Sequence, residues 1–234
     1  YLGLLQSVGR FEDCCGAIYC ALEKSDDDQL DPAYKGRLRL ELARCLFKLG
    51  DVRQAQEIAD ERVIQEQPQK AAFLLAIQIS RASLNPSAAL NLCETALVHW
   101  PDEDVKQAKV WTLLQTKDLA GASRAFRDLK HQNLFLSFSL NMAARRFGQA
   151  WEDIQALERT NETSALQIKR QTARFMLAEG RNQTAFRYIS NQLSAHAGDP
   201  VLSGAMMEVL LKLDRGKEAI HFAKDQGSSV VSDQ

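Results

Sequence analysis

The sequence lacks any long uninterrupted hydrophobic run. No stretch approaches the roughly 18 apolar residues of a transmembrane helix, so membrane insertion is not expected. An excess of either charge is also missing, because 29 basic and 30 acidic residues leave a net charge of −1. Nucleic-acid binders usually carry a basic excess or a basic stripe, so binding to nucleic acid is disfavoured.

Motifs for catalysis and for metal binding are absent as well. There is no Gly-rich phosphate loop and no nucleophile elbow. The histidines fall near expected helix ends or loops, and none has a second histidine or a cysteine four residues away: His99, His131, His196 and His221. No acid, base and nucleophile cluster can be assembled, so we expect neither an enzyme nor a bound cofactor or metal.

The cysteines lack the paired Cys-x-x-Cys spacing of a zinc or redox site: Cys14, Cys15, Cys20, Cys45 and Cys93. Cys14, Cys45 and Cys93 fall where helices are expected to face one another, so we interpret them as small buried residues. Unpaired cysteines and the lack of a signal segment favour a reducing, cytoplasmic compartment. Asn161 and Asn182 open formal glycosylation patterns, which are short enough to occur by chance.

Proline is scarce, and its five positions all coincide with expected breaks between helices. Three of them follow a capping residue directly, in the pairs Asp31-Pro32, Asn85-Pro86 and Asp199-Pro200. A capping side chain followed by proline at the first helical position predicts a helix start. Glycines that end helices are expected at Gly9, Gly50 and Gly180.

Small residues recur at a nearly constant interval, and we call them the anchor residues: Cys14, Ala55, Ala89, Ala122, Ala150, Ala185 and Ala219. Their spacings are 41, 34, 33, 28, 35 and 34 residues. A period near 34 with two amphipathic helices per period indicates an array of helix hairpins. The short step from Ala122 to Ala150 predicts an irregularity there.

Apolar residues at helical spacing predict antiparallel helix pairs throughout, after one initial hairpin. The expected ranges are 32–48, 52–65, 70–82, 86–99, 103–115, 119–130, 134–145, 148–158, 164–179, 182–196, 200–213 and 216–226. The sequence thus predicts an all-α repeat array over residues 1–226 and a flexible tail over residues 227–234.

With the anchor residues aligned, the chain resembles the tetratricopeptide repeat (TPR) family. The best copy keeps Leu42, Ala43, Leu46, Gly50, Ala55, Ala59 and Pro68, and the next keeps Phe73, Ala76, Ala89, Cys93, Ala96 and Pro101. Six to seven degenerate copies cover nearly the whole chain, and another helical-hairpin array is the structural alternative. The resemblance implies a right-handed superhelical solenoid whose concave face, formed by the first helix of each repeat, binds a peptide or partner protein.

The resemblance also implies which side chains line that concave groove. They are Arg37, Leu40, Arg44, Lys48, Leu74, Gln78, Arg81, Trp111, Phe135, Met142, Arg170 and Arg174. This lining would suit an acidic partner with an apolar residue at its centre. Alternatively, the cations form a solvated surface and Trp111 serves packing between repeats. Arg44 and Gln78 stand where the family's chaperone-tail clamps carry Asn, which argues against such a clamp.

We therefore expect a non-enzymatic scaffold or adaptor for protein partners. The alternative is a recruiting segment of a larger enzyme or of an export or assembly machine. Because the chain opens at Tyr1 within a repeat, we expect it to be a piece of a longer array. The apolar stripe of the last repeat, which includes Ile220 and Ala223, should be covered by residues beyond the chain, by Val230 and Val231, or by a second copy. We favour missing sequence, and self-association is then expected as a consequence of its absence.

Overall fold

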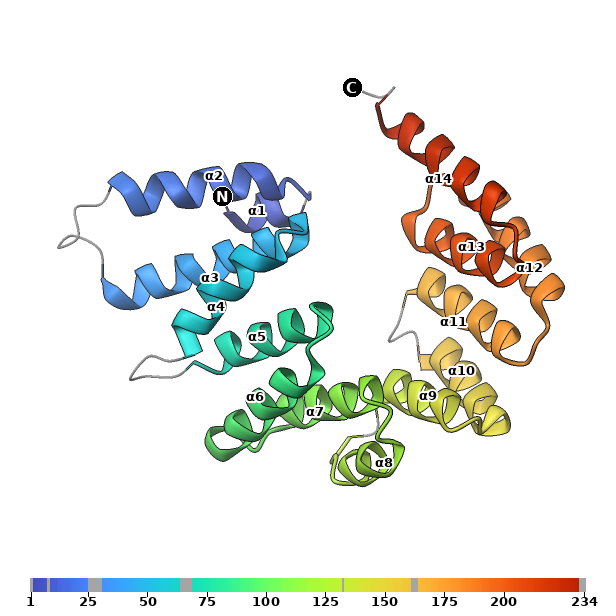
Figure 1. Cartoon of the computed structure of the whole chain (residues 1–234), viewed down its shortest axis with the longest axis horizontal. Coiled ribbons are helices and arrows are strands. Elements are labelled where there is room, and N and C mark those ends of the chain that lie inside the picture. The colour runs from blue at the N-terminus through green and yellow to red at the C-terminus, as the bar shows by residue number, and fades with distance from the viewer. Residues whose placement is uncertain are drawn as a thin grey trace. The chain divides into compact units, whose positions relative to one another are not determined.

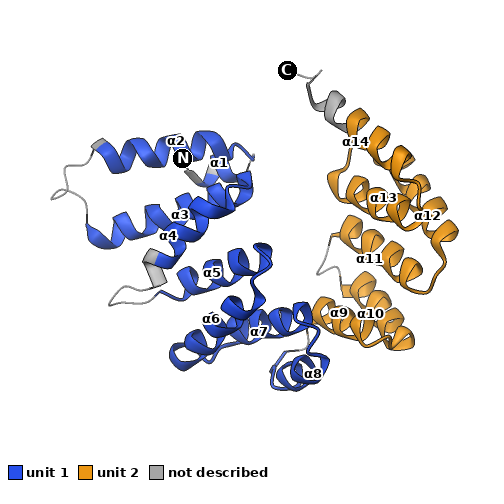
Figure 2. Cartoon of the chain, viewed as in Figure 1, with its two compact units in different colours: residues 1–131 blue, residues 132–234 orange. Residues whose placement is uncertain are grey.

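A computed structural model describes residues 2–7, 9–24, 31–63, 69–131, 133–160 and 164–231, and these contain fourteen α-helices and no strand (Figure 1). The prediction of an all-α fold is confirmed. The chain divides into two compact units, Tyr1–His131 and Gln132–Gln234 (Figure 2). The boundary between them falls within the short step from Ala122 to Ala150, where the sequence predicts an irregularity.

The first unit is a stack of four helix hairpins. Every helix packs against the next one in the chain, and in addition α5 contacts both α3 and α7. The first helices of successive hairpins therefore lie side by side. The eight helices are α1 (Leu2–Ser7), α2 (Phe11–Lys24), α3 (Pro32–Leu49), α4 (Val52–Val63), α5 (Lys70–Ala82), α6 (Pro86–His99), α7 (Glu103–Gln115) and α8 (Leu119–Arg127).

The second unit is built in the same way from three hairpins. Consecutive helices pack against each other, and α11 also contacts α13. Its helices are α9 (Leu134–Ala143), α10 (Phe147–Thr160), α11 (Ala165–Ala178), α12 (Asn182–Ala195), α13 (Pro200–Lys212) and α14 (Gly216–Val231). The described residues thus contain seven hairpins, in agreement with the predicted six to seven repeats.

Helix starts are set by the predicted capping pairs. The side chains of Asp31 and Asn85 each accept a backbone hydrogen bond of 3.2 Å in the first turn of α3 and α6. Asp199 accepts two such bonds of 2.9 Å at α13. These bonds satisfy backbone N–H groups that have no partner within the helix. All three predicted starts are confirmed.

The turn inside each hairpin is the same structure repeated seven times. Each first helix ends at one residue with positive φ: Gly9, Gly50, Leu84, Lys117, Arg145, Gly180 and Asp214. After it, a backbone N–H bonds back to a carbonyl five residues earlier, as from Asp51 to Leu46 and from Asn85 to Ser80. This pattern is the Schellman motif, which ends helices with a left-handed residue. Each such residue precedes an anchor residue by five positions.

The anchor residues are buried where the helices of each hairpin cross. Six of them are 0% exposed and Ala219 is 1% exposed, so the predicted packing role is confirmed. A small side chain lets two helices approach closely at the crossing. The cysteines Cys14, Cys45 and Cys93 are buried and free, also as predicted.

Most helix bounds agree with the sequence prediction within two residues, with two larger differences. Helix α8 ends at Arg127 and not at 130, because the carboxylate of Glu103 accepts the backbone N–H groups of Lys130 and His131 at 3.2 and 3.1 Å. Helix α14 continues to Val231, beyond the predicted end at 226. Pro68, the glycosylation pattern at Asn161 and residues 232–234 of the predicted tail lie outside the described residues.

Candidate partner-binding site

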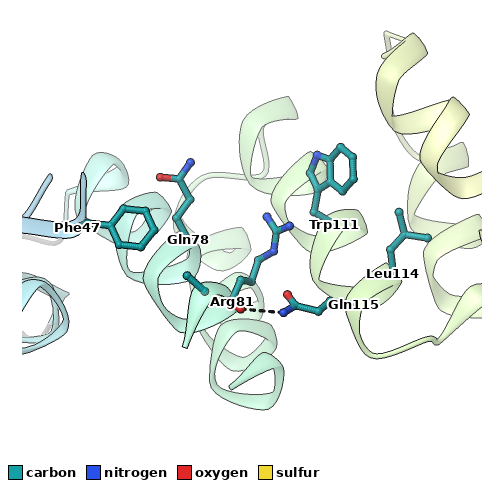
Figure 3. Close-up of a pocket in the computed structure, with 7 residues that line it drawn as sticks. Phe47, Gln78, Arg81, Trp111, Leu114 and Gln115 are labelled. Atoms are coloured by element: carbon teal, nitrogen blue, oxygen red, sulfur yellow. Dashed lines mark hydrogen bonds between the residues drawn. The ribbon is translucent and has the colours of Figure 1, made fainter. Parts of the chain in front are cut away.

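A pocket lies on the first unit where the first helices of three hairpins meet. It has a volume of about 550 Å³ and receives side chains from α3, α5 and α7. Its lining consists of Phe47, Gln78, Arg81, Ala82, Trp111, Leu114 and Gln115 (Figure 3). Three of these, Gln78, Arg81 and Trp111, are residues that the resemblance places in a partner-binding groove.

Arg81 is the central side chain of this pocket. Its guanidinium carbon lies 5.8 Å from the centre of the Trp111 ring, within the range of a cation–π contact (Figure 3). The backbone carbonyl of Arg81 accepts a hydrogen bond of 2.8 Å from the Gln115 amide, which ties α5 to α7. The pocket is therefore held together by the same residue that supplies its charge.

The charge of Arg81 is unbalanced in the described part of the chain. Its Nε atom is buried and has no hydrogen-bond partner there, and none of the described carboxylates forms an ion pair with it. Burial lowers the pKa of Arg81 from its usual value, but a guanidinium remains a cation at neutral pH. No acidic side chain lines the pocket. The site can therefore accept a carboxylate in bidentate geometry beside the Trp111 ring.

The predicted groove residues of α3 have different surroundings. Arg37 and Lys48 are exposed, whereas Arg44 is half-buried and forms an ion pair with Glu41 one turn earlier. Leu40 is only 5% exposed and belongs to the core between α2 and α5, so its placement in the groove is wrong.

On α5, Leu74 is partly buried against a core cluster that includes Phe73 and Trp100. Leu74 therefore packs against the core, although it lies on the same helix as Arg81. Within the first unit, the exposed cations of the predicted lining are therefore Arg37 and Lys48, both on α3.

The predicted residues of the second unit are engaged with their own neighbours. Phe135 and Met142 are partly buried against a core cluster that includes Phe138 and Ile154. Arg170 and Arg174 both pair with Glu208 of α13, at 2.5 and 3.2 Å. Because both arginines pair with the same carboxylate, the positive charge that the sequence predicted at this surface is partly neutralised.

Sequence reasoning missed several members of the site. Phe47, Leu114 and Gln115 had no motif to mark them, although they lie one helical turn or less from Lys48 and Trp111. Among the described residues no group of three His, Cys, Asp or Glu side chains is placed to hold a metal ion. No described helix has the length and apolarity required to cross a membrane.

Comparison with known proteins identifies the fold. No family model and no curated protein matches the sequence. A tetratricopeptide repeat protein from Parabacteroides merdae is similar in structure, with a TM-score of 0.68 and 13% sequence identity. The similarity covers 97% of this chain and 90% of that one. The chain therefore has a TPR-like helical-repeat fold.

Two longer chains show weaker similarity. The structure of Naa15/Naa10 bound to HypK-THB gives a TM-score of 0.45 at 15% identity, over 96% of this chain and 35% of that one. A monomeric mutant of IFIT1 with Gppp-AAAA gives 0.49 at 14% identity, over 99% and 60%. Both scores lie below 0.5, so the fold assignment rests on neither structure.

Proposed function

We propose that this chain is a non-enzymatic scaffold that binds an acidic segment of a protein partner on the first unit. The observation that carries this proposal is Arg81, a partly buried cation without a described carboxylate partner, in a pocket with Trp111. The partner's carboxylate would pair with the guanidinium, and an adjacent apolar side chain would pack against Phe47, Trp111 or Leu114. The exposed Lys48 at the end of α3 would attract the same acidic segment.

The same binding activity would also serve a recruiting segment within a larger enzyme or assembly machine. The free, buried thiols of Cys14, Cys45 and Cys93 support placement in a reducing compartment such as the cytoplasm. The identity of captured partners would distinguish a free adaptor from such a segment.

Affinity capture with the full chain tests the proposal. Wild type, Arg81→Gln and Trp111→Ala are compared by quantitative mass spectrometry, after thermal melting has shown that each variant is folded. Each substitution should weaken a genuine partner about tenfold or more, which corresponds to about 1.4 kcal/mol. Arg187→Gln, at an exposed position on α12, is the matched control and should retain the partner. Equal recovery by all variants would refute the proposal.

Self-association through the last hairpin is a separate proposal. Ile220 on α14 is 59% exposed, and Ala223 on the same helix is also exposed. Two copies could bury these side chains against each other. Sedimentation over a concentration range should show a dimer that Ile220→Ser abolishes, and a monomer at every concentration would contradict it.

A further inference from the structure

A second hollow lies on the other unit, between α10 and α11. Its volume is about 440 Å³, and its lining is Phe147, Gly148, Trp151, Phe175, Met176, Glu179 and Arg181. We call it the aromatic cleft. It shares no residue with the pocket around Arg81, so it does not depend on the function proposed above.

Three aromatic rings build the apolar part of this cleft. Phe175 is 5% exposed, and the rings of Phe147 and Trp151 pack on it with centroid distances of 6.1 and 5.4 Å. Trp151 itself is 40% exposed. A large aromatic side chain left in solvent beside a hollow is typical of an interaction site, because aromatic residues supply much of the energy of protein interfaces.

Residue 148, which lines the hollow, has no side chain. Gly148 lies between Phe147 and Trp151 on α10, and a Cβ atom added there would meet no atom within 4 Å. Its helical backbone does not require glycine, because its φ lies outside the left-handed region. Glycine therefore leaves space at this point without a backbone reason for it.

The charged residues of the lining and next to it in the chain indicate which charge an occupant should carry. Glu179 is paired with Arg181 at 3.3 Å, so these two largely cancel. Arg145 and Arg146 lie in the turn directly before Phe147, and both are exposed without an ion pair to any described residue. The exposed Glu152 offsets one of them. Arg145 and Arg146 therefore leave an excess of positive charge in the chain next to the lining residues Phe147 and Trp151, which is complementary to a carboxylate.

We propose that the aromatic cleft docks a bulky aromatic or aliphatic side chain of a partner segment with an acidic residue next to it. The side chain fills the space beside Gly148 and covers the exposed face of Trp151. The neighbouring carboxylate pairs with Arg145 or Arg146. A quaternary ammonium ligand fits less well, because Phe147 and Trp151 both pack on Phe175 and the exposed charges beside them are mainly positive.

Nuclear magnetic resonance of the full chain with short peptides tests this assignment. The probes are Ac-Glu-Phe-Glu-NH2, the same peptide with Lys in place of Glu, the same peptide with Ser in place of Phe, and choline. Only the first peptide should shift the Trp151 indole signal in a saturable manner. Absence of that shift, or an equal response to the lysine peptide or to choline, would overturn the proposal.

Variants at neighbouring positions of α10 locate the effect. Gly148→Leu fills the hollow with a better helix former and should weaken binding of Ac-Glu-Phe-Glu-NH2 about tenfold or more. Gln149→Leu adds the same kind of side chain at an adjacent exposed position and should leave the affinity unchanged. If both variants bind equally well, the peptide does not occupy the cleft.

Discussion

Replacing Leu84 by glycine should stabilise the protein. Leu84 has φ of 55° in the turn between α5 and α6, where Gly50 and Gly180 stand in the corresponding turns. A left-handed backbone costs a residue with a Cβ atom about 1 to 2 kcal/mol, and glycine avoids this cost. Leu84 is 82% exposed, so its removal sacrifices little apolar burial.

The expected gain in the free energy of unfolding is the backbone strain that is relieved at residue 84. From it one subtracts the extra conformational entropy that glycine loses on folding compared with leucine. That entropy is about 0.5 to 1 kcal/mol, so the net stabilisation should be up to about 1.5 kcal/mol. For a chain of this size, 1 kcal/mol shifts the melting temperature by about 2 to 4 °C. Urea unfolding followed by circular dichroism should show a higher midpoint with an unchanged slope.

The reciprocal variant is Gly180→Ala, at a residue with φ of 77°. An added Cβ atom would meet no atom within 4 Å, so any loss of stability comes from the backbone conformation and not from a clash. We expect a net loss of up to about 1.5 kcal/mol, because the strain of about 1 to 2 kcal/mol is partly offset by the entropy of about 0.5 to 1 kcal/mol that alanine saves. A destabilised Leu84→Gly, or a Gly180→Ala as stable as wild type, would refute the account of the seven turns.

Three further variants test the packing and the electrostatics. Ala89→Leu, at a fully buried helix crossing, should cost about 1 to 3 kcal/mol in thermal unfolding, whereas Ala120→Leu at an exposed position of α8 should cost little. Glu208→Gln, which removes the carboxylate shared by two arginines of α11, should lower the stability by at most about 1 kcal/mol and make it less sensitive to salt. Burial raises the pKa of Asp153 above its ordinary 3.8, although the side chains of Asn141 and Ser137 donate hydrogen bonds to it. The folded state therefore holds this proton more tightly than the unfolded chain, so the contribution of Asp153 is greatest below pH 3.8 and is lost as the pH rises through the folded pKa. Melting curves between pH 3 and 7 should show that Asp153→Asn removes this part of the pH dependence, and an unchanged profile would contradict the assignment.

The sequence predicted the helices well because their ends carry local signals. Capping residues before Pro32, Pro86 and Pro200 set three starts, and glycines marked three of the hairpin turns. The turn at Leu84 has the same geometry without the glycine, so no residue type revealed its left-handed conformation. The 34-residue period still placed that turn, since Ala89 follows it by five positions.

Contacts between helices were harder to predict from the sequence. Arg170 and Glu208 are 38 positions apart, and their pairing depends on how α11 and α13 are rotated about their axes. The position of Trp151 over Phe175 depends on the packing of α10 against α11 in the same way. Local spacing therefore predicted which helices form the candidate site. It predicted only some of the side chains that line it.

Site-specific photocrosslinking in cells tests the central claim, that the first helices of the first unit bind a partner. A benzophenone amino acid at position 78 would lie in the pocket beside Arg81, and the same amino acid at position 95 would lie at an exposed position of α6. The account predicts a discrete protein adduct from position 78 that Arg81→Gln weakens, and none from position 95. An adduct from position 95 alone, or no adduct from position 78, would contradict it.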